Sequence, residues 1–143
     1  GMASSVADLG YAGVSGVQLS TLFNIFGVGN DTADANLQIF HNDATGTATK
    51  IDLGASFPAN RTAGAISTTF YEIQLLNLPA SASIQYRVIN KETGAIATGT
   101  VTTNLPDATL GLNFFASRCM TTIGSVTGSG QFDCAKLGVY SML

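Results

Sequence analysis

The stretch from Thr69 to Pro106, TFYEIQLLNLPASASIQYRVINKETGAIATGTVTTNLP, decides the fold of this 143-residue chain. Apolar side chains alternate with polar ones in two runs, at Tyr71, Ile73 and Leu75 and again at Ile84, Tyr86 and Val88. Successive side chains of a strand point to opposite faces, so each run predicts a strand with one apolar and one polar face. Asn90–Gly94 predicts a turn in which Gly94 adopts a positive φ. Ala95–Thr103 then predicts a third antiparallel strand, which ends before Pro106.

Shorter strand signals surround this stretch, and clusters of Asn, Asp and Gly separate them. They lie at 17–28, 37–41, 47–53, 110–119 and 131–143, with turns at 29–35 and 42–46. About eight short strands without an amphipathic helix are typical of an antiparallel sandwich or jelly roll. We therefore expect a single all-β domain over residues 17–143. Its predicted core comprises Tyr71, Ile73, Leu75, Ile84, Tyr86, Val88, Leu112, Phe114, Leu137 and Val139.

Two N-terminal segments bear on self-association. Residues 1–16 are rich in Gly, Ala and Ser and predict an arm, either loose or packed on a neighbouring subunit. Gly1 before Met2 is typical of a cloning scar. Residues 17–28 carry apolar side chains on both faces, Leu22 and Phe26 among them, which indicates a central strand or one covered by another chain. A homo-oligomer follows as an expectation.

Composition narrows the function classes. Charged residues make up only 10% of the chain, well below the usual share of about 25%. The six Lys and Arg residues are scattered and the net charge is −3, so we expect no nucleic-acid binding. No apolar run approaches the roughly 20 residues of a membrane span, and no secretion signal is present, which predicts synthesis in the cytoplasm.

Several strand motifs carry a family resemblance. These are Phe70–Leu75, Ile84–Gly94, Thr102–Pro106 (TTNLP) and Leu137–Tyr140, with weaker matches at Phe26–Asn30 and Phe40–Asp43. Their order resembles the concanavalin A-like lectin/glucanase jelly roll, including laminin-G-like forms, as found in bacteriophage and prophage structural proteins. The resemblance implies a fibre-tip or decoration domain of a virion or phage-derived particle, and a trimer slightly in preference to a dimer.

The catalytic residues of that family are missing from this chain. Its glucanases carry a Glu-x-Asp-x-x-Glu strand, whereas Glu72 and Glu92 are the only glutamates here. We therefore expect a structural or adhesion domain with no enzymatic activity and no cofactor, whose partners are a surface glycan or a virion protein. A free-standing carbohydrate-binding module and an inactive relative of the glycoside hydrolases are the alternatives.

Few side chains qualify for a site. Asp31, Asp34, Asn36 and Asp43 offer oxygen ligands for calcium, but solvated turns are the favoured interpretation of these residues, so we expect no metal site. The single histidine, His41, is expected at a strand end with its ring partly exposed. Tyr11, His41 and Tyr140 are the candidates for a ligand surface.

Cys119 and Cys134 are the only cysteines. An in-register hairpin centred between Val126 and Thr127 places them opposite each other, both facing outward. A disulfide and a pair of reduced thiols both fit this arrangement.

Overall fold

The structure is a computed structural model, and it describes residues 2–3, 19–31, 33–59, 69–78, 81–106 and 116–117. Within these ranges the chain is almost entirely β, as the sequence predicts. One short 3₁₀ helix, η2 (Leu19–Thr21), accompanies eight strands. The strands are β1 (Met2–Ala3), β2 (Ile25–Gly29), β3 (Gln38–Asn42), β4 (Thr49–Asp52), β5 (Tyr71–Asn77), β6 (Ile84–Asn90), β7 (Ile96–Val101) and β8 (Ala116–Ser117).

The stretch from Thr69 to Pro106 forms a sheet of three consecutive antiparallel strands, in the order β5-β6-β7. β5 and β6 pair over all seven residues, from Tyr71 opposite Asn90 to Asn77 opposite Ile84. The turn between β6 and β7 has Gly94 at a φ of 76°, which confirms the predicted use of glycine there. β7 is shorter than the predicted Ala95–Thr103.

The other antiparallel sheet begins earlier in the chain and has the strand order β4-β3-β2-β1-β8. We call it the first sheet, and β5-β6-β7 the second sheet. Its three longer strands, β2 to β4, come from the predicted strand regions that precede residue 54. β1 pairs with β2 and with β8 of the same chain. Met2 and Ala3, at the start of the expected N-terminal arm, are therefore part of a sheet and not loose.

The predicted strand 17–28 is only partly correct. Leu19–Thr21 is a 3₁₀ helix, and the strand begins at Ile25. Asn24 has a φ of 48°, a left-handed conformation that Asn tolerates better than most residues, and it interrupts the extended chain. The expected burial on both faces holds at Ile25 and Phe26, which are neighbours in β2 and both buried. Alternation alone could not reveal the break, because the apolar residues continue across it.

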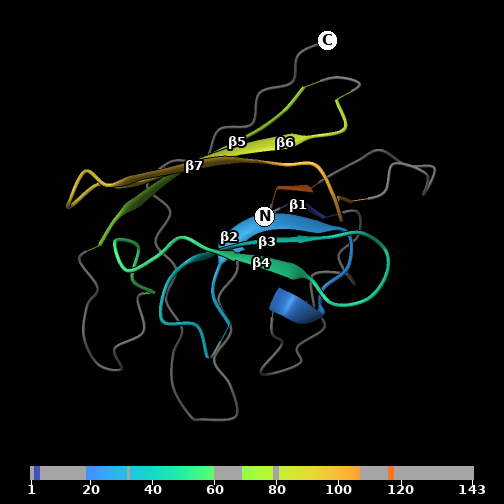
Figure 1. Cartoon of the computed structure of the whole chain (residues 1–143), viewed down its shortest axis with the longest axis horizontal. Coiled ribbons are helices and arrows are strands. Elements are labelled where there is room, and N and C mark those ends of the chain that lie inside the picture. The colour runs from blue at the N-terminus through green and yellow to red at the C-terminus, as the bar shows by residue number, and fades with distance from the viewer. Residues whose placement is uncertain are drawn as a thin grey trace.

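The two sheets form two layers, with β5–β7 above β2–β4 in Figure 1. Their facing sides contribute to one buried cluster, made of Phe26, Leu37, Ile39, Phe57, Ile84, Val88 and Val101. The loop after β4 helps to join the layers, since the Tyr71 hydroxyl donates to the Pro58 carbonyl at 2.6 Å and Asn90 Nδ2 donates to the Ser56 carbonyl at 2.8 Å.

The opposite side of β2–β4 is covered by the segment that contains η2, which lies below that sheet in Figure 1. Gly29 allows this close approach, because a Cβ there would lie 2.4 Å from Cδ1 of Leu19. Phe40 points to this side and is fully buried, while its neighbour Ile39 is fully buried toward the other sheet. All five residues of β3 are buried. β3 is therefore the strand enclosed on both faces.

The predicted core is confirmed in part. Ile84 and Val88 are buried, and Tyr71, Leu75 and Tyr86 are half-buried and pack against the core cluster. The assignment of Ile73 to the core is wrong, because 47% of this residue is exposed. Among the described strands β5 lies at a sheet edge, so Ile73 has a strand on one side only, whereas Val88 opposite it on β6 has one on each side. Leu112, Phe114, Leu137 and Val139 lie outside the described residues.

The pair Ile73 and Val88 gives a matched test of this core. Val88→Asp should unfold the domain, because an uncompensated buried charge costs several kcal/mol out of a total stability of about 5–15 kcal/mol. Ile73→Asp introduces the same group on the same face and should fold, with a loss of about 1 kcal/mol. Urea denaturation followed by circular dichroism measures both. Equal destabilisation by the two substitutions would contradict this assignment of the core.

Candidate functional site: polar clusters around the first sheet

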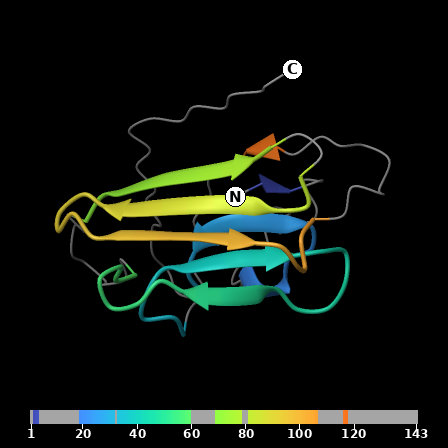
Figure 2. The ribbon, with the colours of Figure 1, turned by 45° about the horizontal axis from the view of Figure 1, so that its top comes forward.

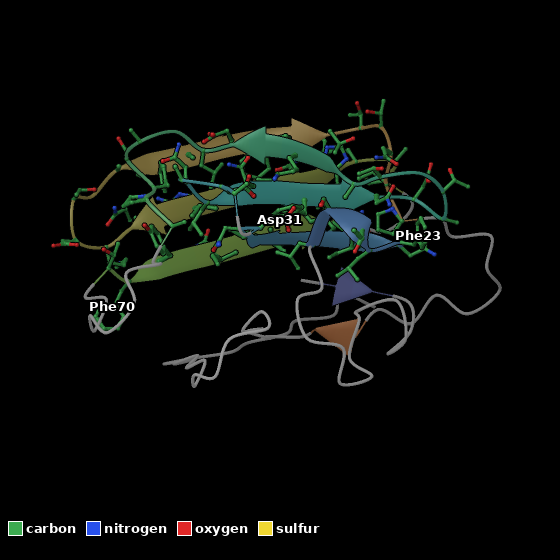
Figure 3. All side chains as sticks on the ribbon, turned by 90° about the horizontal axis from the view of Figure 1, so that it is seen from below. Phe23, Asp31 and Phe70 are labelled. Atoms are coloured by element: carbon green, nitrogen blue, oxygen red, sulfur yellow. The ribbon has the colours of Figure 1, made fainter. Side chains whose placement is uncertain are left out.

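A lysine and two carboxylates meet on the η2 side of the first sheet. Lys50 on β4 stands directly across from Phe40 on β3, and its Nζ lies 5.4 Å from the centre of that ring. The same Nζ makes ion pairs with Asp31, at 3.4 Å, and with Asp34. We call Lys50, Asp31 and Asp34 the lysine cluster. Figure 3 shows Asp31 beside η2, in front of the sheet.

The turn after β2 builds the lysine cluster. Asp31 is 7% exposed, and its Oδ1 accepts from the backbone N–H of Leu19 at 2.6 Å, which fixes the start of η2. The backbone N–H of Asp31 donates to Asp34 Oδ2 at 2.8 Å, a local turn of the kind that Asp favours. Burial lowers the pKa of Lys50, but the hydrogen bond and charge of Asp34, with those of Asp31, outweigh burial and leave the pKa raised above its usual value.

The four candidate calcium ligands do not converge. Asp31 and Asp34 surround the Lys50 ammonium, which takes the place that the calcium hypothesis gave to a metal ion. Asn36 donates to Asp52 at 3.1 Å, and Asp43 accepts from the Thr45 backbone N–H at 2.8 Å in a different turn. Within the described ranges, no group of three or more His, Cys, Asp or Glu residues could hold a metal ion.

Asp52 is a carboxylate held in its charged form. The backbone N–H of Gly54 donates to it at 2.7 Å, and this bond, followed by those of Gln38 and Asn36, lowers the pKa of Asp52. The contacts tie the end of β4 to the start of β3. They are structural contacts at the surface, and they leave Asp52 a poor proton donor.

The single histidine is buried in the sheet that forms the first layer. His41 is 3% exposed, so the expected partly exposed ring is wrong, and so is His41 as part of a ligand surface. The ring lies on the same face as Phe26, with ring centres 6.5 Å apart. Its Nδ1 lies 3.1 Å from the Asn104 carbonyl oxygen, which can only accept, so Nδ1 carries the proton. The ring is therefore enclosed by the fold and not presented to solvent.

Asn104 is the residue that the sequence analysis missed. Its Oδ1 accepts from the Asp43 backbone N–H at 3.0 Å, and its Nδ2 donates to the His41 carbonyl and the Thr49 hydroxyl. One side chain thus joins the chain after β7 to the β3–β4 hairpin. Asn104 has a φ of 49°, and an Asn two residues before a Pro in the TTNLP motif was the available signal.

The remaining candidates are only partly placed. Tyr11, Tyr140, Cys119 and Cys134 lie outside the described residues. Glu72 on β5 is exposed and bound to Lys91, at 3.1 Å, and to Gln74. The Lys91 hydrogen bond is the largest cause of the lowered pKa of Glu72, so this carboxylate stays charged at neutral pH.

Comparisons with protein-family models, with curated proteins and with solved structures found no match for this chain. In the described part of the chain, no helix is long and apolar enough to cross a membrane. The chemistry of the described side chains is therefore the main guide to function.

The lysine cluster predicts a pH-dependent stability. Because the folded pKa of Lys50 is raised, its contribution is complete below the unfolded value, near 10.5, and is lost as the pH rises through the folded value. Lys50→Gln should cost about 1 kcal/mol at pH 7 and should flatten the decline in stability above pH 10.

Lys91→Gln is the control for this prediction, since its ion pair with Glu72 is largely exposed and should contribute little. Urea denaturation at pH 7, 9 and 11 provides the measurement. A Lys50→Gln protein as stable as the wild type at pH 7 would show that the lysine cluster does not hold the fold.

Proposed function

We propose that this chain is a non-enzymatic structural or adhesion domain of a phage-like particle, with a jelly-roll sandwich of the concanavalin A-like type. One observation carries the proposal: the buried polar side chains of the first sheet are used to fasten loops. Asp31 binds Leu19 and Lys50, and His41 binds the backbone of Asn104. Nucleophilic catalysis needs a nucleophile, a base and an orienting group in contact, and the described residues provide no such set.

The layered arrangement supports the fold component of this proposal. Two antiparallel sheets share one cluster of buried apolar side chains, as in a sandwich. The TTNLP motif, on which the family resemblance partly rests, contains Asn104, which connects the chain after β7 to the β3–β4 hairpin.

A carbohydrate-binding module is the second candidate, and the outer face of β5–β7 favours it. The outward side chains there include Gln74, Gln85 and Arg87, which are planar hydrogen-bonding groups. Planar polar groups on the outer face of a sheet suit the hydroxyls of a sugar chain. The two candidates are compatible, because an adhesion domain of a particle can act by binding a surface glycan.

Labelling of particles tests the proposed location. Gold-conjugated antibodies against the purified chain should decorate phage-like particles released from the source culture, at a tip or along the shell. The capsid-free supernatant of the same preparation is the control. Particles that carry no label, with the chain found only in the soluble fraction, would contradict the proposal.

An activity assay tests the non-enzymatic part. The purified chain should release no reducing sugar from a panel of polysaccharides. Release that disappears in Glu72→Gln, with folding unchanged by circular dichroism, would show that the chain is a hydrolase.

We also propose that the chain works as a homo-oligomer. The support for it is a different surface from residues 17–28, on which the sequence-based expectation rested. Leu22 and Phe26 are buried within one chain, so strand 17–28 no longer requires a second subunit. Exposed apolar side chains concentrate instead along and beside β5, at Phe70, Ile73, Leu76 and Leu78. Such a surface on an edge strand favours a covering partner.

Sedimentation at micromolar concentration measures the oligomeric state. We expect a species larger than the 14.7 kDa monomer, and the trimer remains the expectation from the family resemblance. Leu76→Lys should weaken the assembly, whereas Thr98→Lys, on the exposed middle of the same face, should not. A wild-type chain that sediments as a monomer would overturn the proposal.

A further inference from the structure

The outer face of the three-stranded sheet carries a compact block of hydrogen-bonding side chains. Gln85 and Arg87 on β6 stand directly opposite Thr100 and Thr98 on β7. We call these four residues the polar block. They share the face that points away from Val88 and the core, because residues two apart on a strand lie on the same side. Figure 2 shows β6 and β7 side by side at the front of the molecule.

The side chains of the polar block are not used by the fold. Within the described ranges, no side-chain hydrogen bond or ion pair engages any of the four. The charge of Arg87 helps to lower the pKa of Glu72, but only as the smallest of several causes and without a hydrogen bond between the two side chains. The oxygens of Glu72 are bound by Lys91 and Gln74 instead. Arg87 thus keeps its donors available.

This arrangement contrasts with the first sheet. There the Lys50 ammonium has two carboxylate partners, and the amide of Asn36 is bound to Asp52. On the second sheet an arginine, a glutamine and two threonines remain open together on a surface that the regular pairing of β6 with β7 makes continuous. An open guanidinium beside open neutral groups indicates a ligand that carries one negative group among hydroxyls.

We propose that the polar block binds an acidic glycan, a chain of sugars bearing carboxylates. Arg87 would hold a carboxylate through two parallel hydrogen bonds, for which the planar guanidinium is suited. Gln85, Thr98 and Thr100 would bind sugar hydroxyls, in two rows about 7 Å apart along the strands. Ile96, which is 55% exposed on the same face, would lie against the C–H side of a ring. The inference rests on the adhesion function proposed above.

The same observations argue against other polyanions. Nucleic acids are bound by many cations, because each neutralised phosphate adds to the affinity. The polar block has a single arginine, and the chain as a whole has a net charge of −3. An acidic peptide such as poly-glutamate carries a carboxylate on every residue and no hydroxyl groups, whereas the polar block offers one cation among three neutral groups.

Isothermal titration calorimetry with two matched polymers tests the inference. The probes are oligogalacturonate, which carries a carboxylate on each sugar, and the same oligomer as its methyl ester. The full chain should bind the acid form about 10- to 100-fold more tightly than the ester, the range expected for a charge-assisted bidentate contact. Poly-glutamate at equal charge concentration should bind no better than the ester.

Variants at two cations, the half-buried Arg87 and the exposed Lys91, assign the effect. Arg87→Gln should lose the preference for the acid form, and Arg87→Lys should lose most of it, because Lys lacks the planar fork. Lys91→Gln removes the same charge from the adjacent turn and should leave the preference intact. Circular dichroism checks that each variant is folded.

Four results would overturn the inference. The first is that neither polymer binds, and the second is that poly-glutamate binds as well as the oligogalacturonate. The third is equal weakening by Arg87→Gln and Lys91→Gln, which would indicate unspecific attraction. Preference for the ester would reject the acidic ligand while retaining a glycan adhesin, and the particle-labelling experiment decides the adhesion role independently.

Discussion

The burial of β3 on both faces is the constraint on which the rest of the structure depends. A strand of five buried residues needs a cover on each side, since neither Ile39 nor Phe40 can face water without a loss of a few kcal/mol. The second sheet covers one side. The segment that contains η2, which leads into β2, covers the other side, and it can do so because Asn24 redirects the chain and Gly29 leaves room for Leu19.

That enclosure explains where the polar side chains of the first sheet lie. Two sheet layers with loops packed over them bury backbone groups that must find partners. Asp31 meets this need at η2, Asn104 meets it at the β3–β4 hairpin, and Asn90 meets it at the loop that includes Ser56. The Asp-rich turns that the sequence offered as candidate calcium sites therefore hold the covering segments in place through hydrogen bonds. The Lys50 ammonium supplies the positive charge.

The sequence was informative where a strand had one wet face. Regular alternation predicted β5 and β6 and their turn to within a few residues, since solvent and core impose opposite demands on neighbouring side chains. Alternation failed as a guide where the burial of a residue depended on contacts with distant parts of the chain. Ile73 follows the alternation of the core-facing side chains, yet it is exposed because β5 lies at a sheet edge among the described strands. Local alternation cannot show which strand lies at an edge. His41 was misplaced for the converse reason, since the residue that encloses it, Asn104, is 63 positions away.

The division of polar groups between the two sheets also indicates where function should be sought. A buried or bridged side chain contributes to stability only while its partner stays in place, so Asp31, Lys50 and Asn104 cannot bind a ligand without loosening the fold. The side chains of the polar block have no partner among the described residues of the fold, so substitutions there should change the proposed binding without changing stability. The proposed binding and the packing of the core would then depend on different faces of the structure. Selection for a new ligand can act on β6 and β7 while the packing around β3 stays unchanged.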